Sequence, residues 1–183
     1  MFSIVMPLDN GRFEQFRNTK QAYDAMPQKK EFIIPTRSAP DLKDYLKDNK
    51  LDKNVLVIPY TIEVGFNCSR ALNIGVRNAH FDTIIITCPE VKPITPVLEQ
   101  LEACKGKNIV CQVWETDIEG NKKWSLVNSR RKNYSPEAYF LAMFNKKDIE
   151  SINGWDEEFM KGYAFEDCDF GARWVRAGLP FEI

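Results

Sequence analysis

Residues 67–90 read NCSRALNIGVRNAHFDTIIITCPE, in which a helix-length amphipathic segment leads directly into a short apolar strand. We expect Asn67 or Ser69 to cap a helix that runs to about Asn78. The strand that follows, from Thr83 to Thr87, consists of β-branched residues and is apolar throughout its centre. Strands without a polar face are typical of the middle of a parallel sheet, so this segment predicts a buried central strand.

The rest of the chain repeats this alternation of strand and helix, with Pro or Gly between the units. Such alternation predicts an α/β fold with a mostly parallel central sheet flanked by helices. We expect further strands over Ser3–Met6, Glu31–Ile34 (stopped by Pro35), Val55–Ile58, Asn108–Trp114 and Tyr139–Phe144. We expect further helices over Phe13–Met26, Asp41–Asn49, Pro93–Ala103, Lys146–Ile152 and Asp167–Ala177, and a small hairpin with its turn at Asp117–Asn121.

Composition argues against several classes of protein. The chain has 183 residues and a formal net charge of -1 without a long basic run, so nucleic acid is not an expected partner. We expect neither a transmembrane segment nor a cleaved signal peptide, because no long apolar stretch occurs. The five cysteines form no C-x-x-C pair and His80 is the only histidine, which argues against a zinc site or a disulfide framework. We therefore expect reduced thiols in a cytoplasmic protein.

Two acidic clusters could carry chemistry. Cys88-Pro89-Glu90 follows the central strand, and ligands of open α/β sheets gather where strands end, so Glu90 is placed for a ligand or a metal. A single acid after a strand is, however, more often a turn residue or a charge at a helix N-terminus. The acids of Glu166-Asp167-Cys168-Asp169 begin the last predicted helix, where the helix dipole favours them, and Asp169 can pair with Arg173. These residues alone leave both interpretations open.

The order of these segments resembles the glycosyltransferases of the GT-A fold, most closely the family 2 enzymes and the β-1,4-galactosyltransferases. Residues 66–75, FNCSRALNIG, are similar to the pattern F-N-x-x-K-x-L-N-x-G of that family. Residues 152–159, INGWDEEF, resemble its G-G-F-D-E-x-F turn, and residues 162–169, GYAFEDCD, resemble G-W-G-G-E-D-x-D. The resemblance extends over residues 2–183, and the motifs occur in the family's order.

The resemblance implies an inverting glycosyltransferase that moves a sugar from a nucleoside-diphosphate donor, UDP-sugar by default, to a carbohydrate or other hydroxyl acceptor. Asp167 then corresponds to the catalytic base and Glu166 to the residue that holds the acceptor. Glu90 corresponds to the last acid of the D-x-D motif, which binds Mn²⁺ or Mg²⁺ at the diphosphate. Cys88 replaces the first acid of that motif, and a thiol is a poor ligand for a hard cation.

Further nucleotide contacts are predicted at Asn10, Thr36, Arg37 and Asn73, because these residues follow strands or lie on the Asn-x-Gly helix. Asn73 could equally be a capping or packing residue. The second predicted strand departs from the family, since residues 33–38 contain no acid to contact the base and ribose. The late histidine ligand of the family also has no counterpart in the chain.

We expect a single domain over residues 1–183, with a nucleotide-sugar half over 1–107 and an acceptor-binding, catalytic half over 108–183. The chain is expected to end before the usual C-terminal segment of the family. Two alternatives remain open. One is a degenerate, non-catalytic glycan-binding or scaffolding module whose metal site is lost at Cys88. The other is a nucleotidyltransferase, whose N-terminal loop the residues Pro7–Arg12 resemble only faintly.

Overall fold

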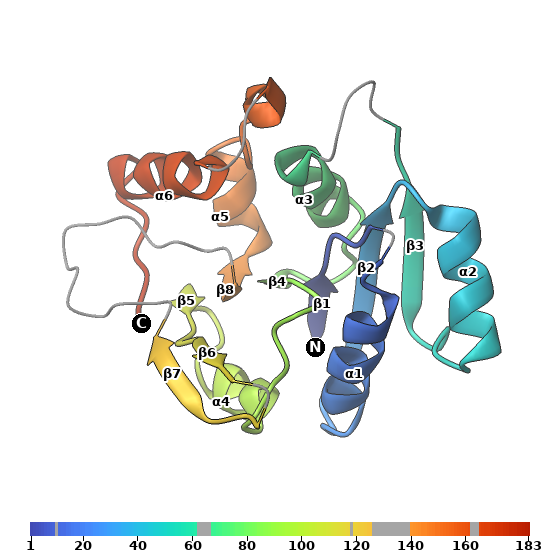
Figure 1. Cartoon of the computed structure of the whole chain (residues 1–183). Helices are drawn as coiled ribbons and strands as arrows, with labels where there is room; N and C mark the ends of the chain where they lie inside the picture. The colour runs from blue at the N-terminus through green and yellow to red at the C-terminus, as the bar shows by residue number, and fades with distance from the viewer. Residues whose placement is uncertain (10, 62–66, 118, 126–139, 162–164) are drawn as a thin grey trace.

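A computed structural model of the chain describes residues 1–9, 11–61, 67–117, 119–125, 140–161 and 165–183. Its centre is a six-stranded sheet with the strand order β3-β2-β1-β4-β8-β5 (Figure 1). Neighbouring strands from β3 to β4 are parallel, whereas β8 is antiparallel to both β4 and β5. The strands are β1 (Phe2–Val5), β2 (Lys30–Thr36), β3 (Val55–Pro59), β4 (Thr83–Thr87), β5 (Ile109–Val110) and β8 (Leu141–Asn145).

Helices cover both faces of this sheet. Buried residues of α1, α2 and α4 pack in one hydrophobic cluster with Ile4, whereas those of α3, α5 and α6 pack in a second cluster with Val5. Consecutive strand residues point to opposite faces, which explains how β1 serves both clusters. The helices are α1 (Phe13–Asp24), α2 (Ala39–Asp48), α3 (Cys68–Arg77), α4 (Val97–Ala103), α5 (Lys146–Ser151) and α6 (Glu166–Arg176), with a 3₁₀ helix η1 (Glu157–Lys161).

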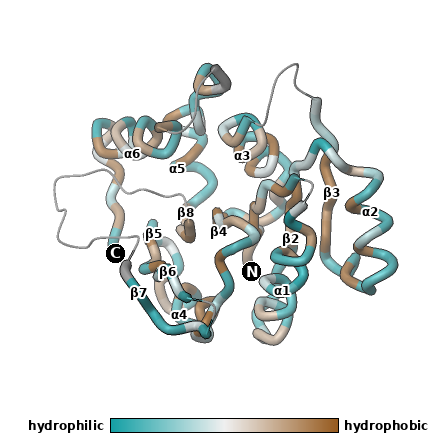
Figure 2. The backbone as a smooth tube through the Cα atoms, viewed as in Figure 1, coloured by the Kyte–Doolittle hydropathy of each residue, from teal (hydrophilic) through white to brown (hydrophobic). Residues whose placement is uncertain are grey.

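The structure confirms the predicted fold class and most of the predicted elements. Thr83–Thr87 forms β4 between β1 and β8, and it is buried as expected of a central strand. Asn67 caps α3, since its side-chain oxygen accepts a hydrogen bond from the Arg70 N–H at 2.8 Å. Figure 2 shows hydrophobic residues along β3 and hydrophilic turns on the outside of α1 and α2. The predicted hairpin is also present, formed by β6 (Trp114–Thr116) and β7 (Lys122–Ser125).

The sequence predicts that Pro35 stops the second strand, and this prediction is wrong. β2 continues to Thr36, and Pro35 pairs with Ile58 of β3 in register. Proline removes only the backbone donor, and the Pro35 carbonyl still accepts a hydrogen bond from the Leu8 N–H at 3.1 Å. The strand therefore extends to Thr36 instead of ending at Ile34 as predicted.

Two other predicted elements are shorter than expected. The helix expected over Pro93–Ala103 begins only at Val97, because a residue before proline, here Thr95 before Pro96, disfavours helical backbone. The strand expected over Asn108–Trp114 is split, with Ile109–Val110 in the main sheet and Trp114 in the hairpin. The apolar pattern of that segment does not reveal that the chain leaves one sheet to enter another. Tyr139, in the last predicted strand, lies outside the described residues.

The contact between α3 and β1 depends on Gly75. A Cβ atom placed on Gly75 would lie 2.3 Å from Cγ1 of Val5 and 3.3 Å from Cγ of Pro35. Only glycine lets the helix backbone approach the strand this closely. The glycine of the Asn-x-Gly pattern thus fixes how near α3 lies to the sheet.

We predict that Gly75→Ala will lower the free energy of unfolding by about 1–3 kcal/mol, because the added methyl group overpacks the contact with Val5. Thermal or urea denaturation measures the effect. Val5→Ala serves as the matched partner in a double-mutant cycle, since it removes the atom that clashes. Strictly additive effects of the two substitutions would contradict this account of Gly75.

Candidate functional site

A large cavity of about 1450 Å³ opens beside the carboxyl end of β4. Segments that are distant in sequence form its walls, namely the start of α1, the first turn of α3, the loop after β4 and the first turn of α6. It brings together three of the predicted site residues, Cys88, Glu90 and Glu166, and adds Arg12 and Ser69. Pockets for small ligands are typically about 300–1,000 Å³, so this cavity has room for more than one ligand group.

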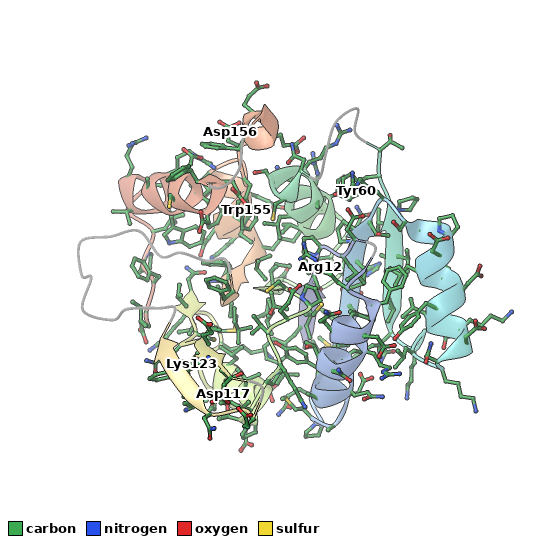
Figure 3. The ribbon with its side chains drawn as sticks, in the orientation of Figure 1. Arg12, Tyr60, Asp117, Lys123, Trp155 and Asp156 are labelled. Atoms are coloured by element: carbon green, nitrogen blue, oxygen red, sulfur yellow. The ribbon has the colours of Figure 1, made fainter. Side chains whose placement is uncertain are left out.

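Glu90 is half exposed at the cavity wall and is paired with a residue that the sequence did not indicate. Its Oε1 lies 3.2 Å from a terminal nitrogen of the Arg12 guanidinium, and the two side chains are 46% and 45% exposed. Arg12 lies immediately before α1 and is labelled in Figure 3. The charge of Glu90 is therefore already balanced by a protein cation.

Cys88 lies at the end of β4 and is partly buried. Burial, together with the nearby Glu90 carboxylate, raises the pKa of the Cys88 thiol to about 12. The thiol is therefore protonated at neutral pH, whereas the thiolate is the form that binds metals.

The sequence predicts a divalent cation at this point of the cavity. Mg²⁺ and Mn²⁺ prefer several hard oxygen ligands. The described residues offer one carboxylate, that of Glu90, which is engaged by Arg12, and one neutral thiol, that of Cys88. Within the described ranges no group of three or more His, Cys, Asp or Glu side chains could hold a metal ion. This donor set does not fit a hard divalent cation.

The first turn of α3 faces the same cavity. Ser69 is 1% exposed, lines the cavity, and its Oγ has no hydrogen-bond partner among the described residues. A buried hydroxyl without a partner is costly unless a ligand or water completes it. The N-terminus of a helix also carries partial positive charge, which favours anions. This wall of the cavity therefore suits an anionic ligand group.

A third cluster lies at the ends of β1, β2 and β3. The Arg37 Nε donates a hydrogen bond to Oδ2 of Asp9 at 3.0 Å, and this contact raises the pKa of Arg37. Thr36 is buried, and its Oγ1 accepts a hydrogen bond from the Ser38 N–H at 3.1 Å. Neither Thr36 nor Arg37 is among the described residues that line the large cavity. Asp9 thus supplies a carboxylate to this region, and it follows the first strand instead of the second.

Tyr60 completes this cluster. It is almost fully buried, and its hydroxyl has no hydrogen-bond partner in the part of the chain that the structure describes. Burial and the nearby Asp9 carboxylate raise its pKa, so the hydroxyl stays protonated and can donate. Asn10, the remaining predicted contact here, lies outside the described residues, as do residues 162–164.

Asn73 lies away from the large cavity and is held by protein contacts. Its Nδ2 donates to the Trp155 carbonyl at 2.8 Å and to Oε1 of Glu157 at 3.0 Å, while its Oδ1 accepts from the Trp155 N–H at 2.9 Å. Both amide hydrogens are therefore used within the protein. These contacts are those of a packing residue, the alternative that the sequence left open.

Trp155 lies between α3 and α6 in Figure 3 and contacts residues of both helices. Its ring stacks on Phe170 of α6 with a centroid distance of 4.1 Å and an interplanar angle of 6°. Gly154 has a φ of +63°, and a Cβ on it would lie 2.3 Å from Oδ1 of Asn73. The turn 153–155 is therefore shaped to receive the Asn73 amide.

The first turn of α6 carries the predicted catalytic pair. Glu166 is 7% exposed and lines the large cavity. Asp167 is partly buried, is not among the described lining residues, and accepts a hydrogen bond from the Cys168 N–H at 2.8 Å. Asp169 instead pairs with Arg173 at 2.7 Å, as an ordinary helical ion pair. The three acids thus have distinct environments.

Phe165 precedes this pair in an unusual conformation. Its φ is 77°, in the left-handed region, and its side chain is 67% exposed. A bulky residue in that region is strained, and such strain is concentrated at functional sites. The resemblance aligns this position with a glycine of the G-W-G-G-E-D-x-D pattern, which would adopt the conformation without cost.

Comparisons with solved structures give the same architecture at low sequence identity. TarS of S. aureus (residues 1–349) superposes with a TM-score of 0.70 at 11% identity, covering 94% of this chain and 54% of TarS. A mannosyltransferase of Pyrobaculum calidifontis, in complex with GDP-Man and Mn²⁺, superposes with a TM-score of 0.68 at 13% identity, covering 99% of this chain and 53% of its own. The chain has the GT-A glycosyltransferase fold. The predicted resemblance and sheet architecture are confirmed.

A family model gives an independent match. Residues 127–183 match the model described as the N-terminal domain of galactosyltransferase. TarS in complex with UDP-GlcNAc also superposes on the chain, with a TM-score of 0.68 at 14% identity over 94% of this chain and 52% of TarS. No curated protein matches the sequence. The chain spans about half the length of these solved structures. In the described ranges, no helix has both the length and the apolar character to cross a bilayer.

We predict that Asn73→Ala will lower the free energy of unfolding by about 2–4 kcal/mol, because both backbone groups of buried Trp155 lose their partner. Asn78→Ala is the matched control. It removes an exposed amide that donates to the Ile74 carbonyl at the end of the same helix. Urea denaturation of both variants measures the difference, and equal effects would contradict the role of Asn73.

We predict that Phe165→Gly will raise the free energy of unfolding by about 1 kcal/mol, because glycine relieves the left-handed backbone strain. Phe165→Ala is the control, since alanine removes the exposed ring but keeps the strain. Melting curves of the two variants separate these contributions. A lower melting temperature for Phe165→Gly than for Phe165→Ala would show that the backbone at this position is not strained.

Proposed function

We propose that this chain is the core of an inverting glycosyltransferase that moves a sugar from a nucleoside-diphosphate donor, UDP-sugar by default, to a carbohydrate or other hydroxyl acceptor. One observation carries the proposal. The acid Glu166 is a buried residue at the start of α6, and it lies on the wall of the cavity that also contains the end of β4. An acid that lines a cleft together with other polar groups is a candidate for function.

The comparisons support the choice of substrate class. The TarS structure contains UDP-GlcNAc, and the P. calidifontis mannosyltransferase contains GDP-Man. In this chain we assign the diphosphate to the cavity wall between Ser69 and the end of β4. The base and ribose are then assigned to the cluster of Asp9, Thr36 and Arg37 at the ends of β1 and β2, with Asn10 as a further contact. Residues 1–107 would form this donor half and residues 108–183 the acceptor and catalytic half.

The proposed transfer is a single displacement at the anomeric carbon. The acceptor oxygen forms a bond to that carbon from the face opposite the diphosphate, and the bond from carbon to the phosphate oxygen breaks. The electron pair of that bond leaves with the nucleoside diphosphate, and the proton of the acceptor hydroxyl passes to Asp167. Glu166 holds the acceptor through a second hydroxyl. Attack from the opposite face inverts the anomeric configuration.

A divalent cation at Glu90 remains the prediction of the sequence, and the Mn²⁺ of the P. calidifontis mannosyltransferase supports it. Because the residues described around Glu90 do not fit such an ion, no step of the proposed transfer depends on it. A cytoplasmic location likewise remains a prediction.

The second candidate is a non-catalytic glycan-binding module of the same fold. The observation that favours it is Cys88, a protonated thiol at the position where the family has an acid. Such a module would bind a carbohydrate without consuming a donor, and its binding would not depend on a base. Measurements on Glu166 and Asp167 separate the two candidates.

We predict that Asp167→Asn will lower the rate of sugar transfer by about 10²- to 10⁴-fold, because asparagine keeps the shape but cannot accept a proton. Nucleotide-sugar binding and the melting temperature will change little. The assay is a screen of UDP-GlcNAc, other UDP-sugars and GDP-Man with a panel of carbohydrate acceptors, followed by nucleotide release.

Two further variants test this assignment. Asp169→Asn is the matched control, because Asp169 lies in the same helix turn and its carboxylate forms an ion pair with Arg173. Glu166→Gln will weaken acceptor binding, seen as a raised KM. If Glu166→Gln removes transfer while Asp167→Asn retains more than about a tenth of the parent rate, Asp167 is not the base. If the parent binds a carbohydrate, no variant differs from it in that binding and no donor is consumed, the result favours the binding module.

A further inference from the structure

Arg12 occupies the place beside Glu90 where the sequence predicts a metal ion. Its guanidinium is 3.2 Å from the Glu90 carboxylate, and both side chains line the large cavity. We infer that Arg12, instead of a divalent cation, supplies the positive charge that binds the donor diphosphate and neutralises it as it leaves. This inference rests on the proposed function, because the diphosphate is that of the sugar donor.

The position of Arg12 is fixed by rigid elements. Its carbonyl accepts a hydrogen bond from the N–H of Phe16, a fully buried residue of α1. One turn further along α1, the buried Thr19 hydroxyl donates to the Pro89 carbonyl at 2.8 Å. That bond ties α1 to the segment that contains Glu90. The backbone of Arg12 is therefore held beside the end of β4 by the packing of α1, and its half-exposed side chain reaches Glu90 from there.

The chemistry of the guanidinium suits the task. Arginine presents a planar fork of donors that matches phosphate oxygens and remains charged at every physiological pH. Ser69, with its unpartnered hydroxyl, faces the cavity from the first turn of α3. Lys92 adds a further exposed cation to the cavity lining. Together these groups provide cationic and neutral donors for a diphosphate.

Glu90 has a different role in this arrangement from that of a metal ligand. Its carboxylate orients Arg12 through an exposed ion pair, a weak type of contact. A diphosphate can displace it at little cost. When the bond from the anomeric carbon to the phosphate oxygen breaks, the electron pair stays on that oxygen, and the Arg12 donors stabilise the added charge.

The two accounts predict opposite effects at Glu90, which makes them separable. If Glu90 binds a metal, Glu90→Gln weakens diphosphate binding. If Glu90 only forms an ion pair with Arg12, the same substitution frees the guanidinium and strengthens diphosphate binding. The gain is at most about fivefold, because an exposed ion pair is weak. Arg17→Ala is the matched control for Arg12, because Arg17 lies on the same helix and pairs with Glu14 at 2.6 Å.

The test is calorimetry of the full chain with UDP and with inorganic pyrophosphate, each in EDTA and in Mn²⁺. We expect both probes to bind the parent in EDTA, with less than about a threefold gain from Mn²⁺. Arg12→Ala will weaken binding by about tenfold or more, as the loss of a charged hydrogen bond does, while Arg17→Ala leaves it unchanged. Arg12→Lys keeps the charge but loses the planar guanidinium. Its affinity will lie between those of Arg12→Ala and Arg17→Ala. Melting curves verify that each variant is folded.

Several results would overturn the inference. A gain of about tenfold or more from Mn²⁺ in the parent, removed by Glu90→Gln, would make the metal the resident cation. Equal binding by Arg12→Ala and Arg17→Ala, or no binding of either probe in EDTA, would also refute it. Failure of the proposed function gives a different result, in which pyrophosphate binds through Arg12 but no nucleotide sugar binds or reacts. Conversely, transfer that depends on Asp167 but not on Arg12 would retain the function and reject this inference.

Discussion

The arrangement of the site depends on one side-chain amide. Asn73 of α3 bonds both backbone groups of Trp155, 82 residues later in the chain. Trp155 in turn stacks on Phe170, so the amide sets the position of α6 relative to α3. Ser69 lies on one of these helices and Glu166 on the other. A shift of either helix would change the distance between the wall assigned to the diphosphate and the acids assigned to transfer.

Local patterns predicted the elements of the fold well where one physical rule dominates. The apolar β4 segment and the Asn67 cap are such cases. A strand buried on both faces is apolar throughout, and a helix cap requires a particular type of side chain, so both can be recognised in the sequence. Predictions were wrong where pairing partners decide the outcome. Pro35 stays in β2 because the ladder needs only its carbonyl, and the split of residues 108–114 between two sheets depends on β7 and β8.

The site was predictable only in part, for a related reason. The resemblance indicated Cys88, Glu90 and Glu166, which the structure brings to one cavity. It did not indicate Arg12, whose place depends on the hydrogen bond between Thr19 and Pro89, a contact of residues 70 positions apart. Asp9 was missed because the sequence comparison sought an acid after the second strand. In the structure, Arg37, which follows the second strand, pairs with Asp9 in the segment after the first strand.

The antiparallel strand β8 gives the chain a replaceable part. Val110 at the end of β5 pairs with Ala142, and the Cys111 N–H bonds the Leu141 carbonyl at 2.9 Å, so the backbone leaves and re-enters the sheet at one point. The described residues that follow, 112–117 and 119–125, include the hairpin β6–β7, and several of them line the cavity. Changes of length or composition in such an excursion leave the sheet pairing intact. Evolution, or an engineer, can therefore vary the segment between Val110 and Leu141 while the parallel strands β1 to β4 are inherited unchanged.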